Sequence, residues 1–370
     1  MGSGTRTWRS ISLTLVLALL LSACGGAAES GDGAEAGGDT VTEDAAGDAS
    51  PAADGEQAAG ECDEPAAIGM AQAVLPPKFA MLTPSMTEEL GFFDEFCIDA
   101  EIITFQQGIN SLRALQAGEI EVAIPPSASL INAVGEGSPI VAWFSPASNL
   151  PQLILATEEI GTCEDFEGQT VATGGPGDLV HHLMQTYLDT CGLDIDSTDV
   201  EVFVGSAADY GPQLAQGVAQ GSALHVDDKM VIEQDQDITL EVLQDASELI
   251  PEFHYQSLVS RQDYVDDNHD VLARAAAAMM KANRWMQDPA NKEEMLDLAA
   301  EVTQRDREIM EFAYDRYVDQ FPEDCAEALD EDSYMFTQDV QLELGNLDEP
   351  VSYDQIVDTT VCDDAEQLLE

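Results

Sequence analysis

The stretch "LRALQAGEIEVAI", residues 112–124, reads as the end of a helix, a glycine and a short strand. Further along, the chain repeats this order in "LAQGVAQGSALHV", residues 214–226. A glycine after a helix can take the left-handed conformation that closes it, and we expect this of Gly118 and Gly221. Helix–glycine–strand junctions are common in α/β proteins. The two copies therefore indicate a particular fold only together with the segments around them.

The segments around each copy alternate between strand-like and helix-like patterns. Before residue 150 we expect strands at 66–73, 100–106, 120–125 and 139–145, and helices at 81–93, 109–118 and 127–137. After it we expect strands at 169–173, 200–205, 223–226 and 238–244, and helices at 178–192, 210–221 and 228–235. The apolar runs 150–157 and 253–260 are extended, and the chain after residue 267 is helical, most strongly at 271–288. This order predicts an α/β fold with two mostly parallel sheets, flanking helices and a helical C-terminal part.

The charge balance is strongly acidic. The 370 residues include 72 Asp and Glu against 13 Lys and Arg, a formal net charge of −59. Such a surface repels nucleic acid and anionic headgroups, and it is typical of proteins that stay soluble at high salt. A calcium-binding surface is the alternative. The segment 194–199 resembles the start of an EF-hand loop, but Asp199 stands where that loop needs glycine and Gly205 where it needs glutamate.

The N-terminus reads as a lipoprotein signal peptide over residues 1–23. Arg6 and Arg9 precede an apolar run at 11–21, and "LSAC" at 21–24 resembles a bacterial lipobox. Cys24 would then carry the lipid that anchors the protein to the outer side of the cell membrane. Residues 24–60 are rich in Gly, Ala, Asp and Glu and have few large apolar side chains, which predicts a disordered acidic tether.

The remaining six cysteines indicate disulfides in an exported protein. Six cysteines allow fifteen pairings. We expect the sequential one, Cys62–Cys97, Cys163–Cys191 and Cys325–Cys362, in which each pair closes a local loop. Metal binding is the alternative, but the chain has no CxxC pair and no Cys/His cluster at ligand spacing, so we expect no metal site.

Several motifs, in this order, resemble one family. They are "ELGFFDEFCIDAEII" (89–103), the opening stretch, "GSPIVAWFS" (137–145), "CEDFEGQTVATGGPGD" (163–178) and "VLARAAAAMMKANRWMQDP" (271–289). Together they resemble the substrate-binding lipoproteins of bacterial ABC importers, in the nitrate/sulfonate/taurine group related to the thiamine-pyrimidine synthases. Cys97 stands where the family usually has glycine, and Glu121 where it has aspartate.

The resemblance implies a bilobal, type II periplasmic-binding-protein fold. Lobe 1 would comprise residues 62–152 and 256–370, and lobe 2 residues 153–255, with the runs 150–157 and 253–260 as the hinge. A monomer of this kind binds a small molecule in the cleft between the lobes and delivers it to an ABC permease. It needs no cofactor and is not an enzyme; a sensory binding protein without a permease is the alternative.

The ligand site is expected in the loops beyond the carboxyl ends of the strands. These loops hold the candidate ligand-binding residues Lys78, Phe79, Gln107, Ser127, Ser129, Ser145, Ser148, Gly175, Gly177, Asp178, Asp209, Tyr210, Asp227 and Tyr255. The serines could donate to a ligand or cap helices. The loop "GGPGD" (174–178) lacks the Lys and Ser/Thr of a phosphate-binding P-loop, so its backbone N–H groups would face the cleft.

The scarcity of basic residues limits the chemical class of ligand that we expect. Between Glu61 and Val259 the only ones are Lys78, Arg113 and Lys229, whereas several aspartates lie in the predicted cleft loops. We therefore expect a neutral or cationic small heterocycle held against an aromatic side chain. An anion held by helix N-termini is the alternative. Catalysis is not expected, because the cysteine- and histidine-rich site of the related synthases and the GxSxG and HExxH motifs are missing from the sequence.

Overall fold

The computed structural model describes residues 64–72, 76–105 and 108–370. The predicted signal peptide 1–23, Cys24, the tether 24–60, Cys62 and Gln107 lie outside the described residues. Among the described helices, none combines the length and the apolar character that crossing a bilayer requires.

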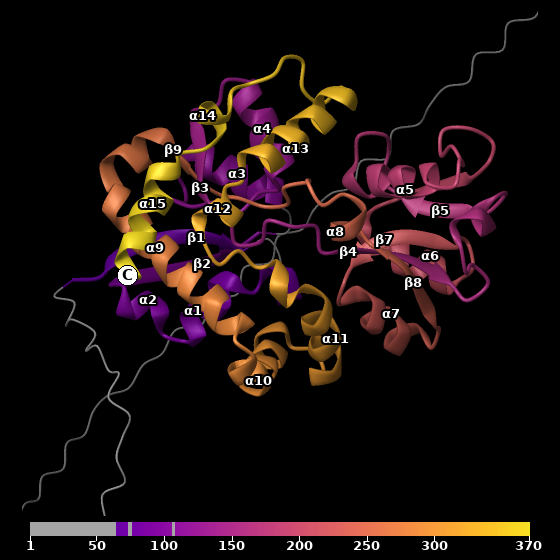
Figure 1. The fold of residues 1–370 in the computed structure, drawn as a ribbon, viewed down its shortest axis with the longest axis horizontal. Coiled ribbons are helices and arrows are strands. Elements are labelled where there is room, and N and C mark those ends of the chain that lie inside the picture. Colours follow the sequence, from indigo (N-terminus) through magenta and orange to yellow (C-terminus); the bar gives the residue numbers. More distant parts are fainter. Residues whose placement is uncertain (1–63, 73–75, 106–107) are drawn as a thin grey trace, which may run out of the picture. The chain divides into compact units, whose positions relative to one another are not determined.

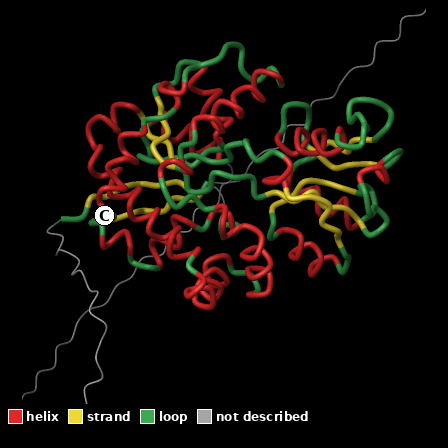
Figure 2. Tube along the Cα trace, in the orientation of Figure 1, coloured by secondary structure: helices red, strands yellow, loops and turns green. Residues whose placement is uncertain are grey.

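The first sheet joins segments that are far apart in the sequence (Figures 1 and 2). Its strands are β1 (Ala66–Gln72), β2 (Ile98–Thr104), β3 (Ile140–Phe144) and β9 (Leu258–Arg261). β1 and β2 pair in parallel, and β3 and β9 pair antiparallel. Isolated bridges connect the two pairs, from Met70 to Val122 in parallel and from Ala123 to Val259 antiparallel. The end of the opening stretch therefore lies in the middle of the sheet, in the order β2–β1–(122–123)–β9–β3.

The second sheet repeats this arrangement. Its strands are β4 (Gln152–Thr157), β5 (Thr170–Thr173), β6 (Glu201–Val204), β7 (Gly221–His225) and β8 (Leu240–Asp245), in the order β6–β5–β7–β4–β8. β5 is parallel to β6 and β7, and β4 is antiparallel to β7 and β8. β7 thus holds the position that residues 122–123 hold in the first sheet. The two helix–glycine–strand copies each lead into the central strand of a sheet, and the extended runs supply the antiparallel strands β4 and β9.

Helices cover both sheets and form the C-terminal part. Those before β9 are α1 (Thr83–Glu89), α2 (Phe92–Glu95), α3 (Gly108–Ala117), α4 (Ser127–Gly135), α5 (Leu179–Asp189), α6 (Ala207–Ala215), α7 (Asp228–Gln236) and α8 (Ala246–Leu249). Those after it are α9 (Gln262–Gln287), α10 (Lys292–Thr303), α11 (Arg307–Tyr317), α12 (Cys325–Ala328), α13 (Glu331–Glu343), α14 (Tyr353–Ile356) and α15 (Thr359–Leu368). Short 3₁₀ turns are η1 (Phe79–Met81), η2 (Cys163–Phe166), η3 (Pro289–Asn291) and η4 (Val318–Gln320). The predicted α/β class and helical C-terminal part are confirmed.

The alanine run of α9 lies in the core of the first sheet. Ala275, Ala276, Ala277 and Ala278 are fully buried beside fully buried Trp143 of β3. Small side chains let the helix approach its neighbours closely, and the Trp143 indole N–H donates to Ser260 Oγ at 3.0 Å, which satisfies its polar atom. This side of the sheet is therefore a packed scaffold, and the ligand site must be sought at the loop edge.

Glycine closes α3 as expected but closes α6 at a different residue. Gly118 has φ of 73°, in the left-handed region. The expectation for Gly221 was wrong, because α6 ends earlier and Gly217, with φ of 67°, follows its last turn. Gly221 instead begins β7, where a Cβ would lie 2.5 Å from the Phe166 ring. Gly221 therefore leaves space for the Phe166 ring and does not close the helix.

This contact gives a testable prediction for Gly221→Ala. Because the added methyl group would overlap the buried Phe166 ring, we expect the free energy of unfolding to fall by about 1–3 kcal/mol, measured by urea denaturation. Gly161→Ala is the matched control, since a Cβ there has its nearest neighbour, Asp165 Oδ2, at 3.8 Å. Equal stability of the two variants would contradict the packing role of Gly221.

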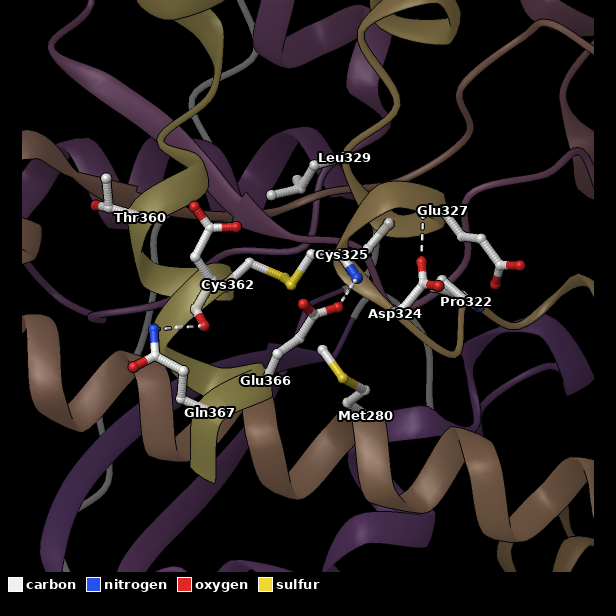
Figure 3. Close-up of a disulfide and its surroundings, with 12 residues drawn as sticks. Met280, Pro322, Asp324, Cys325, Glu327, Leu329, Thr360, Cys362, Glu366 and Gln367 are labelled. Carbon is white, nitrogen blue, oxygen red and sulfur yellow. Dashed lines mark hydrogen bonds between the residues drawn. A yellow bond between two sulfur atoms is a disulfide. The ribbon is translucent and has the colours of Figure 1, made fainter. Parts of the chain in front are cut away.

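The described disulfides confirm part of the predicted pairing. Cys163 is bonded to Cys191, and Cys325 to Cys362. The second bond joins α12 to α15, and the Cys325 N–H donates to Glu366 Oε1 at 2.9 Å beside it (Figure 3). Cys97 is also disulfide-bonded, and Cys62, its expected partner, lies outside the described residues.

Candidate functional site

A cavity of about 370 Å³ lies where two of the predicted loops meet the segment before β9, and we call it the α4–α5 pocket. The start of α4, the start of α5 and the segment before β9 form three of its walls, and α13 with the loop after it forms the fourth. The lining residues are Pro126, Ala128, Ser129, Asn132, Gly177, Asp178, Leu179, His182, Phe253, Tyr255, Val340, Gln341, Leu344 and Asn346.

Four of the predicted ligand-binding residues line the α4–α5 pocket: Ser129, Gly177, Asp178 and Tyr255. Ser129 follows the central strand of the first sheet, and Gly177 and Asp178 follow β5. The rule that ligands lie beyond the carboxyl ends of strands therefore selects two of the loops that form the pocket.

Among the residues that line the α4–α5 pocket, Asp178 is the one whose side chain is a carboxylate. It caps α5, because its Oδ1 accepts from the N–H groups of Val180 at 2.9 Å and His181 at 3.4 Å. Both bonds use Oδ1, so Oδ2 takes part in neither. The cap also means that first-turn N–H groups of α5, which could hold an anion in another protein, already have a carboxylate partner.

The start of α4 is also occupied by the protein's own acceptors. The Ser127 N–H donates to the Tyr255 carbonyl at 2.9 Å, and the N–H groups of Ser129 and Leu130 donate to the Pro126 carbonyl at 2.9 and 3.2 Å. An anion would have to compete with these bonds. Together with the cap on α5, they occupy several of the first-turn N–H groups of both helices, which disfavours an anion at these helix starts.

Aromatic side chains form one wall of the pocket. Phe253 and Tyr255 are buried, and both line it. The Tyr255 hydroxyl lies 3.4 Å from His225 Nε2, and the two rings meet edge to face with centroids 6.1 Å apart. Burial raises the pKa of Tyr255 and lowers that of His225, so both groups are uncharged at neutral pH.

An amide chain from α4 and α13 forms another wall, which the sequence did not predict. Asn346 Nδ2 donates to the Gly177 carbonyl at 3.2 Å and to Gln341 Oε1 at 3.1 Å, and Asn132 Nδ2 donates to the same Oε1 at 3.2 Å. The Gly177 carbonyl can only accept, so it fixes the orientation of Asn346 and then of the other two amides. The chain ties residues after α13 to the loop before α5.

His182 lies on the pocket wall next to Asp178. Desolvation lowers the pKa of His182 against the raising effect of Glu343, so its ring is neutral at pH 7. The lining therefore has one carboxylate, neutral polar side chains and apolar side chains, and none of its described residues is Lys or Arg.

The other predicted serines do not line the α4–α5 pocket. Ser145 is fully buried, and its Oγ donates to the Gln256 carbonyl at 2.7 Å. The Ser148 carbonyl accepts from the Tyr255 N–H at 2.8 Å. Ser127 is fully buried next to the pocket, inside a chain of side-chain hydrogen bonds. These residues position the walls rather than face the cavity.

The remaining predicted ligand-binding residues have structural roles outside the pocket. Phe79 and Tyr210 are buried in one apolar cluster, and burial raises the pKa of Tyr210 to about 12. Asp209 forms a capping box with Ser206, and these hydrogen bonds lower the pKa of Asp209. The Gly175 carbonyl accepts from the Asp178 N–H at 3.0 Å and so shapes the loop before α5.

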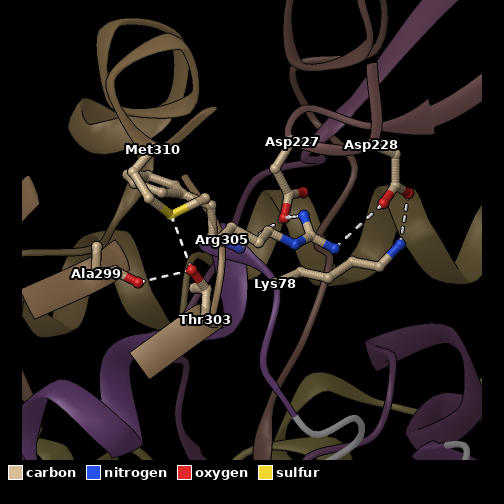
Figure 4. Close-up of polar contacts among 8 residues, drawn as sticks. Lys78, Asp227, Asp228, Ala299, Thr303, Arg305 and Met310 are labelled. Carbon is tan, nitrogen blue, oxygen red and sulfur yellow. Dashed lines mark hydrogen bonds and ion pairs between the residues drawn. The ribbon is translucent and has the colours of Figure 1, made fainter. Parts of the chain in front are cut away.

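Lys78 and Asp227 belong to an ion-pair network with Asp228 and Arg305 (Figure 4). Lys78 Nζ lies 2.5 Å from Asp228 Oδ2, and Arg305 binds Asp227 and lies 3.6 Å from Asp228 Oδ1. The Asp227 side chain is fully buried, and its Oδ2 also accepts from the Phe79 N–H at 3.4 Å. The network connects the loop after β1, the start of α7 and the α10–α11 loop, outside the pocket lining.

The buried hydrogen-bond chain around Ser127 has a definite direction. His254 Nε2 lies 3.1 Å from the Ala328 carbonyl, which can only accept, so the neutral ring carries its proton on Nε2. His254 Nδ1 then accepts from Ser127 Oγ at 2.7 Å, Ser127 accepts from Ser257 at 2.7 Å, and Ser257 accepts from the Tyr334 hydroxyl at 2.7 Å. Each member has the partner that its chemistry requires.

The family model described as NMT1/THI5 like matches residues 83–292, more than half of the chain. The chain belongs to this family. A Bacillus subtilis binding protein, YtlA, is 19% identical over 283 residues, 75% of this chain and 84% of that protein. The formylaminopyrimidine-binding protein of Halalkalibacterium halodurans is 22% identical over 220 residues, 57% of this chain and 63% of that protein.

Several solved structures of the same fold are named as periplasmic binding proteins. The aliphatic sulphonate-binding protein SsuA of Escherichia coli superposes with a TM-score of 0.62 at 19% identity, over 80% of this chain and 93% of that chain. The nitrate-binding protein NrtA of Synechocystis PCC 6803 superposes with a TM-score of 0.66 at 16% identity, over 83% and 90%. The NMT1/THI5-like chain thus has the type II periplasmic-binding-protein fold and is a solute-binding protein of the ABC-import type.

The described residues contain no group of three or more His, Cys, Asp or Glu side chains placed to hold a metal ion. Family and fold are those of binding proteins. The arrangement can enclose a small molecule between an aromatic wall, an amide wall and one carboxylate.

Proposed function

We propose that the α4–α5 pocket binds a neutral or cationic small heterocycle, which the protein delivers to an ABC permease in the membrane. The observation that carries the proposal is the charge of the pocket. Asp178 contributes a carboxylate, His182 is neutral, and the described lining has no basic side chain. A buried anion would lack a counter-ion there, whereas an N–H donor or a cation would have one.

The aromatic wall supports a planar ligand. Phe253 and Tyr255 present apolar ring surface, while Ser129, Asn132 and Asn346 present polar groups around it. A pocket of about 370 Å³ is in the size range of small-molecule sites. The relative from Halalkalibacterium halodurans is named for binding a formylaminopyrimidine, which is a neutral nitrogen heterocycle of this kind.

Anion binding is the competing function, because two proteins of the same fold are named for sulphonate and nitrate. It would require free N–H groups or basic side chains at the pocket. Several first-turn N–H groups of α4 and α5 instead donate to the protein's own carbonyl and carboxylate groups. This is why we favour the heterocycle.

Membrane attachment belongs to the same proposal. Lipid on Cys24 and a flexible acidic tether over residues 24–60 would hold a monomeric binding domain at the outer face of the membrane, within reach of the permease. The lobe assignment, 62–152 plus 256–370 and 153–255, is proposed with it. Closure of such lobes on the ligand would require tighter binding to the closed state.

Calorimetric titration of Asp178→Asn tests the ligand class. The wild-type chain should bind 4-amino-5-aminomethyl-2-methylpyrimidine and neither taurine nor nitrate. Asparagine still caps α5 but lacks the charge, so we expect roughly a 10- to 100-fold loss of affinity for the pyrimidine.

Asp209→Asn is the control for this experiment, because it removes the same charge from a helix start outside the pocket. It should change the affinity by less than about twofold. Binding of taurine or nitrate alone, or equal affinity in wild type and Asp178→Asn, would contradict the proposed ligand class.

A further inference from the structure

A second cavity adjoins the α4–α5 pocket on the other side of His182. It has a volume of about 460 Å³ and shares Gly177, His182 and Leu344 with the pocket, and we call it the annex. Its other walls come from α5, the turn after it, Pro176 and Glu343 of α13. The two cavities therefore meet at the three residues that they share.

The buried His181 presents a ring nitrogen to the annex that has no hydrogen-bond partner among the described residues. Its side chain is only 5% exposed. Thr173 Oγ1 donates its proton to the Gly174 carbonyl at 2.7 Å, so it must accept from His181 Nδ1, which lies 3.3 Å away. The neutral ring then carries its proton on Nδ1, which leaves a lone pair on Nε2.

Asp196 supplies a second acceptor beside this lone pair. Its Oδ1 lies 3.8 Å from His181 Nε2, beyond hydrogen-bond distance, and neither atom can donate to the other while the ring is neutral. Asp189 and Glu343 add two further carboxylates to the wall. The residues that line the annex, all of them described, include no Lys or Arg to balance these charges.

We propose that the annex binds an ammonium group carried on a short arm by the heterocycle in the α4–α5 pocket. An ammonium ion offers three N–H donors, of which one can point to His181 Nε2 and another to Asp196 Oδ1. The carboxylates of Asp189 and Glu343 favour its charge. The inference rests on the proposed function and deepens it, because it specifies a ring that bears a primary amine as the ligand class.

The test compares two pyrimidines that differ in the arm alone. 4-Amino-5-aminomethyl-2-methylpyrimidine has the amine, and 4-amino-2,5-dimethylpyrimidine has a methyl group in its place. Calorimetric titration of the wild-type chain at pH 7.5 should show roughly tenfold tighter binding of the amine. In Asp196→Asn this ratio should fall to about threefold or less, while the affinity for the dimethyl compound stays unchanged.

Asp199→Asn provides the matched control, because it removes the same charge in the same turn at a residue outside the annex lining. It should keep the tenfold ratio. Equal affinity of the wild type for the two pyrimidines, or the same ratio in Asp196→Asn as in the wild type, would overturn the annex and leave the proposed function standing. Binding of neither pyrimidine would instead overturn the proposed function itself.

A protonated His181 that pairs directly with Asp196 is the rival arrangement. In that case the annex would need no ligand, and the ratio between the two pyrimidines would be close to one at pH 7.5. The proposed arrangement predicts the tenfold ratio at that pH.

Discussion

Replacing Arg305 with methionine is expected to lower the free energy of unfolding by about 3–5 kcal/mol. Arg305 binds Asp227, whose side chain is fully buried, and its own side chain is 18% exposed. Removing the guanidinium leaves a buried carboxylate without its counter-ion. Burial already lowers the pKa of Arg305, which indicates that both charges lie in a poorly solvated place. Urea denaturation followed by circular dichroism measures the effect.

Arg307→Met is the control, because Arg307 is 38% exposed and pairs with the exposed carboxylates Glu293 and Asp297. An exposed pair contributes little, so this variant should keep nearly all of the wild-type stability. The double variant Asp227→Asn with Arg305→Met should regain part of the stability, because it removes the unpaired charge. Equal stability of Arg305→Met and Arg307→Met would show that the buried pair does not hold these loops together.

Acidification from pH 7 to pH 4 is expected to remove about 3 kcal/mol of stability through His254 alone. Desolvation lowers the pKa of His254 from 6.5 to about 4. Below pH 6.5 the unfolded chain binds a proton at this histidine and the folded chain does not. Stability from the neutral ring is therefore complete above pH 6.5 and is lost as the pH falls toward 4. Urea denaturation across this pH range measures the loss.

His254→Gln separates this contribution from that of other groups. His225 also has a lowered pKa and contributes with the same sign, but it is present in both proteins. Wild type should therefore lose about 3 kcal/mol more than the variant between pH 7 and pH 4. Ser127→Ala, which leaves His254 Nδ1 without a donor, should cost about 1–3 kcal/mol at pH 7. Parallel pH profiles of wild type and His254→Gln would contradict the account of the buried chain.

The sequence predicted the fold well because its signals are local. Period-two and helical patterns placed the two α/β units, and the two helix–glycine–strand copies placed the central strand of each sheet. The predicted closing glycine of α6 was wrong by four residues, since Gly217 follows the helix and Gly221 already begins β7. Only the contact with Phe166 separates a glycine that ends a helix from one that makes room for a ring.

The pocket could be predicted only in part, because half of its walls come from distant segments. The rule for strand ends found Ser129, Gly177 and Asp178. It could not find Asn132, Gln341 and Asn346, because the last two lie on and after α13, about two hundred residues from α4, and carry no motif. The sequence also predicted Phe79 and Tyr210 as ligand-binding residues, because aromatic side chains occur both in ligand sites and in cores. Only their burial shows that these two belong to the core.

The molecule that co-purifies with the chain tests the central claim most directly. The full chain is produced, exchanged into volatile buffer and weighed by native mass spectrometry, and the released ligand is then fragmented. The account predicts a neutral or cationic nitrogen heterocycle that bears an amine, absent or much reduced in Asp178→Asn. A sulfonate or nitrate that is released from the wild type and retained in Asp178→Asn would contradict it.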